Sequence, residues 1–130
     1  TPALSGLGGL IASFESTGLD VSSSIDIPAG IAEPSVGVTV YRVVQECLTN
    51  ACRHGDGTAT VDLCAHDGRI CLTVENPVGR ALRSPGPGSG LGLAGMRERV
   101  ESSGGRLTIN SGGGRFRVRG EFIPVGAVVP

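Results

Sequence analysis

Aromatic side chains are scarce in this chain of 130 residues: they make up 3% of it, and tryptophan is absent. The core must therefore be built from valine, leucine, isoleucine and alanine. The hydrophobic share of 39% is enough for one modest core but not for two. We expect residues 1–130 to form a single domain, and the 22 glycines indicate many turns or loops.

An excess of either charge is also missing, because the formal net charge is -1. Binding to nucleic acid or to an anionic membrane favours a strongly basic surface, so we expect neither partner. Three arginines at 115, 117 and 119 alternate with apolar residues and fall on one side of a strand pattern. They fit a nucleic-acid stripe or a solvated sheet face, and the overall charge favours the solvated face.

Long apolar runs are absent as well. No segment approaches the ~18 to 20 apolar residues of a membrane span, and the N-terminus lacks the basic start of a signal peptide. We therefore expect this chain to be cytoplasmic, within a full-length protein that could itself be anchored in a membrane.

The cysteines show no metal-binding spacing. Cys47, Cys52, Cys64 and Cys71 contain no Cys-x-x-Cys pair and fall within helix or strand patterns. This distribution predicts buried, reduced thiols and argues against a metal site or a disulfide framework.

Hydrophobic periodicity divides the chain into alternating elements. It predicts helices from residue 4 to near 18, over 34–55 and over 91–103, with Glu33-Pro34 as the start of the long helix. Asp67-Gly68 and the glycines at 112–114 have the composition of turns between strands. Extended segments are predicted at 19–27, 58–65, 70–76, around 107–109 and at 115–122.

Residues 77–90 are rich in proline and glycine, which sustain neither helix nor strand, so we predict a mobile loop there. This loop runs into a helical sequence through Gly88-Ser89-Gly90-Leu91-Gly92-Leu93. Such a junction aims free backbone N–H groups at an anion. On its own it is more often only a tight turn.

The long helix carries an unusual polar set. At about 100° per residue, its apolar arc is bordered by Glu46, Asn50 and Arg53. A solvated polar face would lie opposite the core, whereas a set beside the core can line a cleft. The arc itself comprises Val36, Val40, Val43, Val44, Cys47, Leu48 and Ala51.

Two motifs resemble those of a known family. Residues 45–54, Gln-Glu-Cys-Leu-Thr-Asn-Ala-Cys-Arg-His, resemble its asparagine box, and residues 88–100 resemble its second glycine box. On these motifs the chain resembles the ATP-binding domain of bacterial sensor histidine kinases, whose fold is shared with DNA gyrase, ninety-kilodalton heat-shock chaperones and mismatch-repair ATPases. The run over 90–100, followed by Gly-Gly-Arg-Leu at 104–107, resembles the subgroup that pairs with response regulators carrying helix-turn-helix output domains.

The resemblance implies a fold and a phosphate site. The fold is an α/β two-layer sandwich, a mixed, mostly antiparallel sheet covered on one face by three helices, with 77–90 as the ATP lid. Asn50 would give its amide oxygen to Mg²⁺, and Glu46 would bind an activating water or assist proton removal. Residues 88–93 would lie against the phosphates, the glycines allowing close backbone approach.

Two further residues of the asparagine box keep alternative interpretations. Arg53 matches the position of a phosphate-binding cation, with a surface ion pair as the alternative. His54 falls inside the apolar arc, so it is either a phosphate contact or a hydrogen-bonded packing residue. It is not the phosphoacceptor, which in this family lies on a separate dimerisation domain.

The adenine end departs from the family pattern. Most relatives place an Asp before a Gly-x-Gly, whereas residues 74–79 read Val-Glu-Asn-Pro-Val-Gly and keep only Gly79 of that run. Strand alternation puts Asn76, and not Glu75, on the helix-covered side. The Asn76 oxygen can accept from the adenine amino group, and its NH₂ can donate to ring N1. The alternative is a turn residue before Pro77.

The resemblance also implies an activity and partners. The domain would bind ATP with Mg²⁺ and donate the γ-phosphate to a histidine on a dimerisation helix outside this chain, from which it passes to a response regulator. Alone, it would show little turnover. The alternatives are an anti-sigma-factor-type serine kinase, or a degenerate nucleotide-fold module that only binds proteins, which the missing Asp suggests.

Overall fold

The computed structural model describes residues 2–28, 30–78 and 89–124. Helix α3 begins at Ser89, two residues before the expected start, and β3 includes Pro77. Residues 79–88 of the expected loop, including Gly79 and Gly88, lie outside the described residues. The elements are a 3-10 turn η1 (Leu4–Gly6), α1 (Leu7–Ser16), β1 (Asp20–Asp26), α2 (Pro34–His54), β2 (Thr58–His66), β3 (Arg69–Pro77), α3 (Ser89–Ser102), β4 (Arg106–Gly112) and β5 (Arg115–Phe122).

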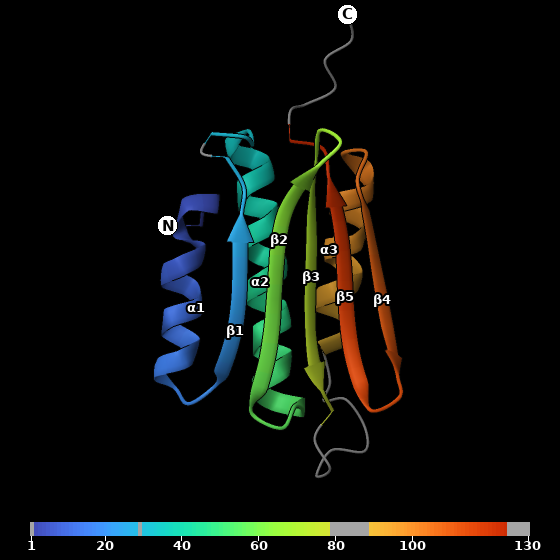
Figure 1. Ribbon diagram of the computed structural model, residues 1–130. Coiled ribbons are helices and arrows are strands. Elements are labelled where there is room, and N and C mark those ends of the chain that lie inside the picture. The colour runs from blue at the N-terminus through green and yellow to red at the C-terminus, as the bar shows by residue number, and fades with distance from the viewer. Residues whose placement is uncertain (1, 29, 79–88, 125–130) are drawn as a thin grey trace, which may run out of the picture.

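The five strands form one mixed sheet in the order β1-β2-β3-β5-β4. Only β1 runs parallel to its neighbour β2, and the other pairs are antiparallel. All three α-helices cover the same face, so the second face is open (Figure 1). The expected two-layer sandwich with a mostly antiparallel sheet is therefore confirmed.

Tight turns set the register of two hairpins. Asp67 and Gly68 join β2 to β3 with φ of 52° and 71°, and Gly113 and Gly114 join β4 to β5 with φ of 62° and 76°. Two consecutive positive φ values define the turn whose twist matches paired strands, and glycine adopts them without steric cost. Both hairpins lie where the glycine-rich turns are predicted.

Helix α2 is central to the helical layer. Pro34 occupies its first turn, where a missing N–H costs no hydrogen bond, and the chain leaves the helix at Gly55. Its apolar stripe is buried as expected from Val40 to Ala51, whereas Val36 in the first turn is half-buried. Although α2 has 21 residues, no helix in the described part of the chain is long and apolar enough to cross a membrane.

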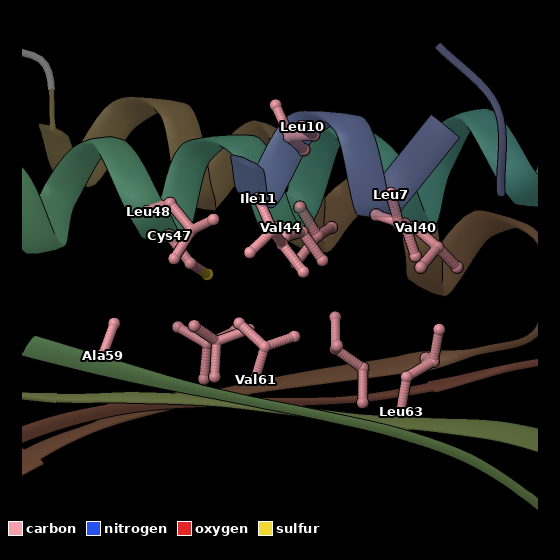
Figure 2. Packing of buried hydrophobic residues seen from close by; sticks show 14 of the residues in the cluster. Leu7, Leu10, Ile11, Val40, Val44, Cys47, Leu48, Ala59, Val61 and Leu63 are labelled. Carbon is pink, nitrogen blue, oxygen red and sulfur yellow. The ribbon is translucent and has the colours of Figure 1, made fainter. Parts of the chain in front are cut away.

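The core fills the space between the helices and the sheet. Figure 2 shows side chains of α1 and α2, such as Ile11, Val44 and Cys47, facing Ala59 and Val61 of β2 across this layer. Side chains alternate between the two faces of each strand. Every second residue therefore packs in this core, while the residues between them reach solvent. The Asn76 and Glu75 faces are as predicted: Asn76 lies on the buried side, and Glu75 lies on the open face.

The cysteines correct one expectation. All four are free thiols, but only Cys47 is buried; Cys52 and Cys64 are exposed, and Cys71 is half-buried. Cys52 lies on the solvent side of α2, and Cys64 and Cys71 lie on the open face of the sheet. Presence in a helix or strand did not imply burial, because both kinds of element have a solvent side.

Candidate functional site

Asn50 is a buried polar residue of α2. Its side chain is 5% exposed. Among the residues that the structure describes, no group donates a hydrogen bond to its Oδ1 atom, which is fully enclosed. A buried acceptor without a donor costs about 1–3 kcal/mol. The position is therefore poorly explained by packing alone and well suited to a ligand that an amide oxygen can bind.

Glu46 lies one helical turn before Asn50, on the same side of α2. Its carboxylate lies against the first turns of α3: a Cβ atom on Gly92 would lie 2.8 Å from Glu46 Cδ and 3.0 Å from each carboxylate oxygen. Glycine is thus the residue that fits at position 92 without displacing the carboxylate. The structure brings together Glu46 of the asparagine box and Gly92 of the second glycine box.

The N-terminus of α3 offers backbone donors at the same place. The first four N–H groups of an α-helix have no intrahelical acceptor, and in α3 these belong to residues 89–92. They can bind an anion. Leu93 differs from these residues, because its side chain is 2% exposed and packs in the core. Leu93 can therefore contribute only its backbone to the predicted phosphate-binding set of residues 88–93, of which Gly88 lies outside the described residues.

The last turn of α2 carries the two remaining residues of the asparagine box. Arg53 is exposed, and His54 is half-buried. Both are basic residues in the last helical turn, a position that the helix dipole favours. Both therefore keep their alternative interpretations, since a structural role is consistent with this placement too.

Asn76 lies against the end of α2. It is 3% exposed, and its Nδ2 atom donates a hydrogen bond of 2.8 Å to the carbonyl oxygen of Pro77. Gly55, which follows α2, forms a bridge with Val78. A Cβ atom at Gly55 would lie 2.5 Å from the Ala51 carbonyl oxygen and 3.1 Å from Asn76 Nδ2. Gly55 therefore lets the end of β3 approach α2.

Gly55 was missed at the sequence level. A glycine after a helix is normally interpreted as a C-terminal cap with positive φ, but Gly55 has a φ of -94°. Its importance comes from contact with Ala51 and Asn76. No sequence signal marks the second of these contacts, because Asn76 is brought to the helix by strand pairing.

The open face of the sheet carries ion pairs. Glu75 Oε1 accepts a hydrogen bond of 2.8 Å from Arg115, and its Oε2 accepts one of 2.6 Å from the Nε of Arg117. Arg69 and Glu121 form a longer pair of 3.6 Å. Arg115, Arg117 and Arg119 are exposed on this face, which confirms that they share a solvent side. Because exposure fits a nucleic-acid stripe as well as a solvated face, the choice between the two stays a prediction. A shallow hollow of about 320 Å³ between these charges is lined by Thr60, Asp62, Thr73, Glu75, Arg117 and Arg119.

Comparison with known proteins places this geometry in a family. Residues 35–124 match the family described as histidine kinase-, DNA gyrase B- and HSP90-like ATPase. The match runs from the first turn of α2 to just beyond β5, so it includes every described residue of the candidate site.

Among curated relatives, the chain is 35% identical over 116 residues to the sensor histidine kinase YxjM of Bacillus subtilis, covering 83% of this chain and 27% of that protein. It is 42% identical over 74 residues to the histidine-protein kinase/phosphatase UhpB of Salmonella typhimurium, covering 56% of this chain and 15% of that protein. The chain thus corresponds to a minor part of each relative's length.

Solved structures agree on the fold. The catalytic domain of histidine kinase ThkA has a TM-score of 0.69 at 14% identity, covering 96% of this chain and 94% of that one. The histidine kinase domain of the Escherichia coli osmosensor EnvZ has a TM-score of 0.64 at 22% identity, covering 98% and 88%. The chain belongs to the histidine kinase-, DNA gyrase B- and HSP90-like ATPase family, as an ATP-binding domain of the histidine kinase type.

Proposed function

We propose that this domain binds Mg²⁺-ATP and supplies the γ-phosphate for phosphorylation of a histidine on a separate dimerisation domain in two-component signalling. The site would lie where the C-terminal half of α2, the start of α3 and the end of β3 meet. The observation that supports it best is the buried Oδ1 atom of Asn50, which no group in the described part of the chain satisfies.

Asn50 suits a magnesium ion. Mg²⁺ prefers oxygen ligands and takes few from the protein, the others being water and substrate phosphates. The described residues contain no group of three or more His, Cys, Asp or Glu that could hold a metal ion. We therefore infer that Asn50 Oδ1 binds the ion only together with the nucleotide. When bound, Mg²⁺ neutralises charge on the phosphates.

Glu46 is the proposed acid-base residue. Its carboxylate lies on the same side of α2 as Asn50, next to the free N–H groups at the start of α3. A carboxylate at that point can accept a proton from the attacking imidazole, directly or through a water. Because Gly92 has no side chain, the Glu46 carboxylate can occupy this position without a steric clash.

Residues at the start of α3 and the end of α2 would hold the phosphates. The N–H groups of residues 89–92 can donate to phosphate oxygens, and the helix dipole adds to this attraction. Arg53 carries a permanent positive charge. Because it is exposed beside the buried Asn50, this charge can face the phosphates. His54 is a further candidate, and Gly79 and Gly88 remain proposed nucleotide-binding residues outside the described part.

Asn76 is the proposed adenine-binding residue. One N–H of its amide is directed at the Pro77 carbonyl, which orients the side chain. The Oδ1 atom can then accept from the adenine amino group, and the second N–H can donate to ring N1. Its burial at 3% exposure, on the helix-covered face, argues against a simple turn residue.

In the proposed reaction, an imidazole nitrogen of the acceptor histidine attacks the γ-phosphorus. A nitrogen–phosphorus bond forms, the bond to the oxygen that bridges the β- and γ-phosphates breaks, and ADP leaves. The chain described here contributes binding, orientation and proton acceptance, while the acceptor comes from the dimerisation domain. The phosphate would then pass to a response regulator, here proposed to be of the helix-turn-helix output class.

Calorimetric titration with ATP and ADP, with and without Mg²⁺, tests binding. We expect Mg²⁺-dependent ATP binding that weakens about 10- to 100-fold in Asn50→Ala. Cys52→Ala is the matched control, because it removes an exposed side chain two residues along the same helix. Absence of binding up to millimolar nucleotide would leave only a protein-binding module. Binding unchanged in Asn76→Ala would overturn the adenine assignment alone.

Labelled ATP tests the transfer step. With a dimerisation domain added, we expect acid-labile phosphohistidine on that domain and a loss of it in Glu46→Ala, while ATP affinity changes little. Acid-stable phosphoserine on an added antagonist protein, with no phosphohistidine, would instead identify a serine kinase.

A further inference from the structure

Two of the four cysteines lie directly opposite each other on the open face of the sheet. Cys64 of β2 pairs with Cys71 of β3 in the antiparallel register. The Cys64 side chain is close enough to the Cys71 thiol to raise the pKa of that thiol. Cys64 is exposed and Cys71 is half-buried, and none of the helices in the described part of the chain covers this face (Figure 1).

The spacing of this pair suits a covalent bond. Residues directly opposite in an antiparallel pair have Cα atoms about 4.5 or 5.5 Å apart. Both distances fall within the range of about 4.4 to 6.8 Å that a disulfide spans. The turn at Asp67-Gly68 holds the two strands in register only a few residues away. The two sulfur atoms can therefore be joined without unfolding either strand.

We propose that Cys64 and Cys71 form a modification site at which a peroxide-class oxidant produces a reversible disulfide between β2 and β3. This site is separate from the proposed ATP site. It lies near the β2–β3 hairpin, whereas Asn76 lies at the other end of β3 (Figure 1).

The two thiols take different parts in the reaction. The Cys64 sulfur, the more accessible one, attacks a peroxide oxygen; an S–O bond forms, the O–O bond breaks, and hydroxide leaves with the thiol proton as water. The Cys71 sulfur then displaces the hydroxyl group from Cys64 sulfur, so that an S–S bond forms and a second water leaves. The two thiols lose two electrons, which reduce the peroxide to water.

The surroundings of Cys71 support its role as the second thiol to react. Partial burial raises the pKa of the Cys71 thiol, and the neighbouring Cys64 and Glu121 groups raise it further. Because the thiolate is the attacking form, Cys71 is a poor first reactant. It becomes effective once the oxidised Cys64 sulfur is held beside it.

The sequence allows a sharp test by peptide mapping. The 130-residue chain is treated with hydrogen peroxide while folded, its remaining thiols are blocked after denaturation, and it is digested with trypsin. Arg69 separates the two cysteines, and the basic residues of the chain place Cys64 in peptide 54–69 and Cys71 in peptide 70–80. Cys47 and Cys52 fall together in peptide 43–53. We expect peptides 54–69 and 70–80 to be linked, and dithiothreitol to separate them.

Three variants serve as controls. Cys64→Ser and Cys71→Ser should each abolish the link, whereas Cys52→Ser should retain it. The thiol count of the denatured wild-type protein should fall from four to two. The proposal is overturned if peptide 54–69 only gains oxygen atoms, or if the link joins two molecules, seen as a dimer on a non-reducing gel. The mapping needs no nucleotide, so failure of ATP binding would leave this result unaffected.

Discussion

The two faces of the sheet differ in whether their polar groups have hydrogen-bonding partners. On the open face, the carboxylate of Glu75 binds two arginines of β5. On the helix-covered side, the buried polar residues among those described are Asn50 and Asn76, both near the end of α2, and Asn50 Oδ1 has no donor there. A polar group that forms hydrogen bonds with its neighbours stabilises a fold. A buried acceptor without a donor does not, so its presence requires another explanation. This difference distinguishes the charged residues that stabilise the sheet from the residues of the proposed binding site.

The largest effect should come from the apolar part of the covered side. Leu63 is 1% exposed, so Leu63→Ala should lower the free energy of unfolding by about 2–5 kcal/mol, because it removes buried methyl groups and leaves a cavity. Thr60→Ala, on the open face of the same strand, should cost less than about 1 kcal/mol. Urea unfolding followed by circular dichroism measures both. Equal costs would mean that the open face is covered in solution.

Burying a charge at position 50 probes the proposed site. Asn50→Asp should lower the free energy of unfolding by about 2 kcal/mol or more at neutral pH, because a carboxylate there loses its hydration. Mg²⁺-ATP should restore part of that stability. Thr108→Asp is the control for the open face and should cost little, because Thr108 is exposed and lies opposite Arg119. If Asn50→Asp costs no more than Thr108→Asp, position 50 is accessible to water in the folded protein and our assignment of Asn50 Oδ1 as a buried ligand atom is wrong.

The pH dependence of Asn50→Asp follows from the same burial. Desolvation raises the pKa of a buried carboxyl above its unfolded value of about 3.9. The protonated form is then favoured in the folded state, so the variant should match wild type most closely below about pH 4. Its deficit should grow as the pH rises from about 4 to the folded-state pKa. Unfolding of variant and wild type at several pH values measures this difference.

The fold could be read from the sequence because its signals are local. Alternation along β2 and β3, the Asp67-Gly68 turn and the stripe of α2 each depend on neighbouring residues, and the structure confirms them. Cysteine burial could not be read in the same way, since Cys52 and Cys64 occupy the solvent sides of their elements.

The candidate site was only partly predictable. The spacing of Glu46 and Asn50 on one side of α2 follows from helix geometry. The approach of Gly92 to Glu46, and of Gly55 to Asn76, could not be read because each joins segments that are distant in sequence. The position of Asn76 at the adenine end depends on strand pairing, which no local pattern encodes. The roles of these residues in binding remain predictions.

Two glycines of α3, Gly92 and Gly95, test the contact between Gly92 and Glu46 with a smaller effect. A Cβ atom added at Gly95 would have no neighbouring atom within 4 Å, so Gly95→Ala should raise the free energy of unfolding by about 0.5–1 kcal/mol through helix propensity. Gly92→Ala should lose that gain, since its methyl group would displace the Glu46 carboxylate. It should also reduce phosphotransfer, while Gly95→Ala should not. Urea unfolding measures both stabilities, and equal gains would show that the Glu46 side chain moves aside freely.

The smallest effect should come from the ion pairs of the open face. The side chains of Arg115 and Arg117 are 55% and 46% exposed, and that of Glu75 is 19% exposed. Such pairs are screened by solvent, so Glu75→Gln should lower the free energy of unfolding by about 0.2–1 kcal/mol, and less at high salt. Glu121→Gln, whose pair with Arg69 is longer at 3.6 Å, should cost less still.

Neither substitution should change Mg²⁺-ATP affinity, because Glu75 and Asn76 point to opposite faces of β3. Urea unfolding at low and high salt, with calorimetric titration of both variants, tests this. A change in affinity in Glu75→Gln would mean that the two faces are coupled through β3. The charges on the open face would then influence Asn76 and the adenine end, and the separation of structural charge from ligand binding would fail.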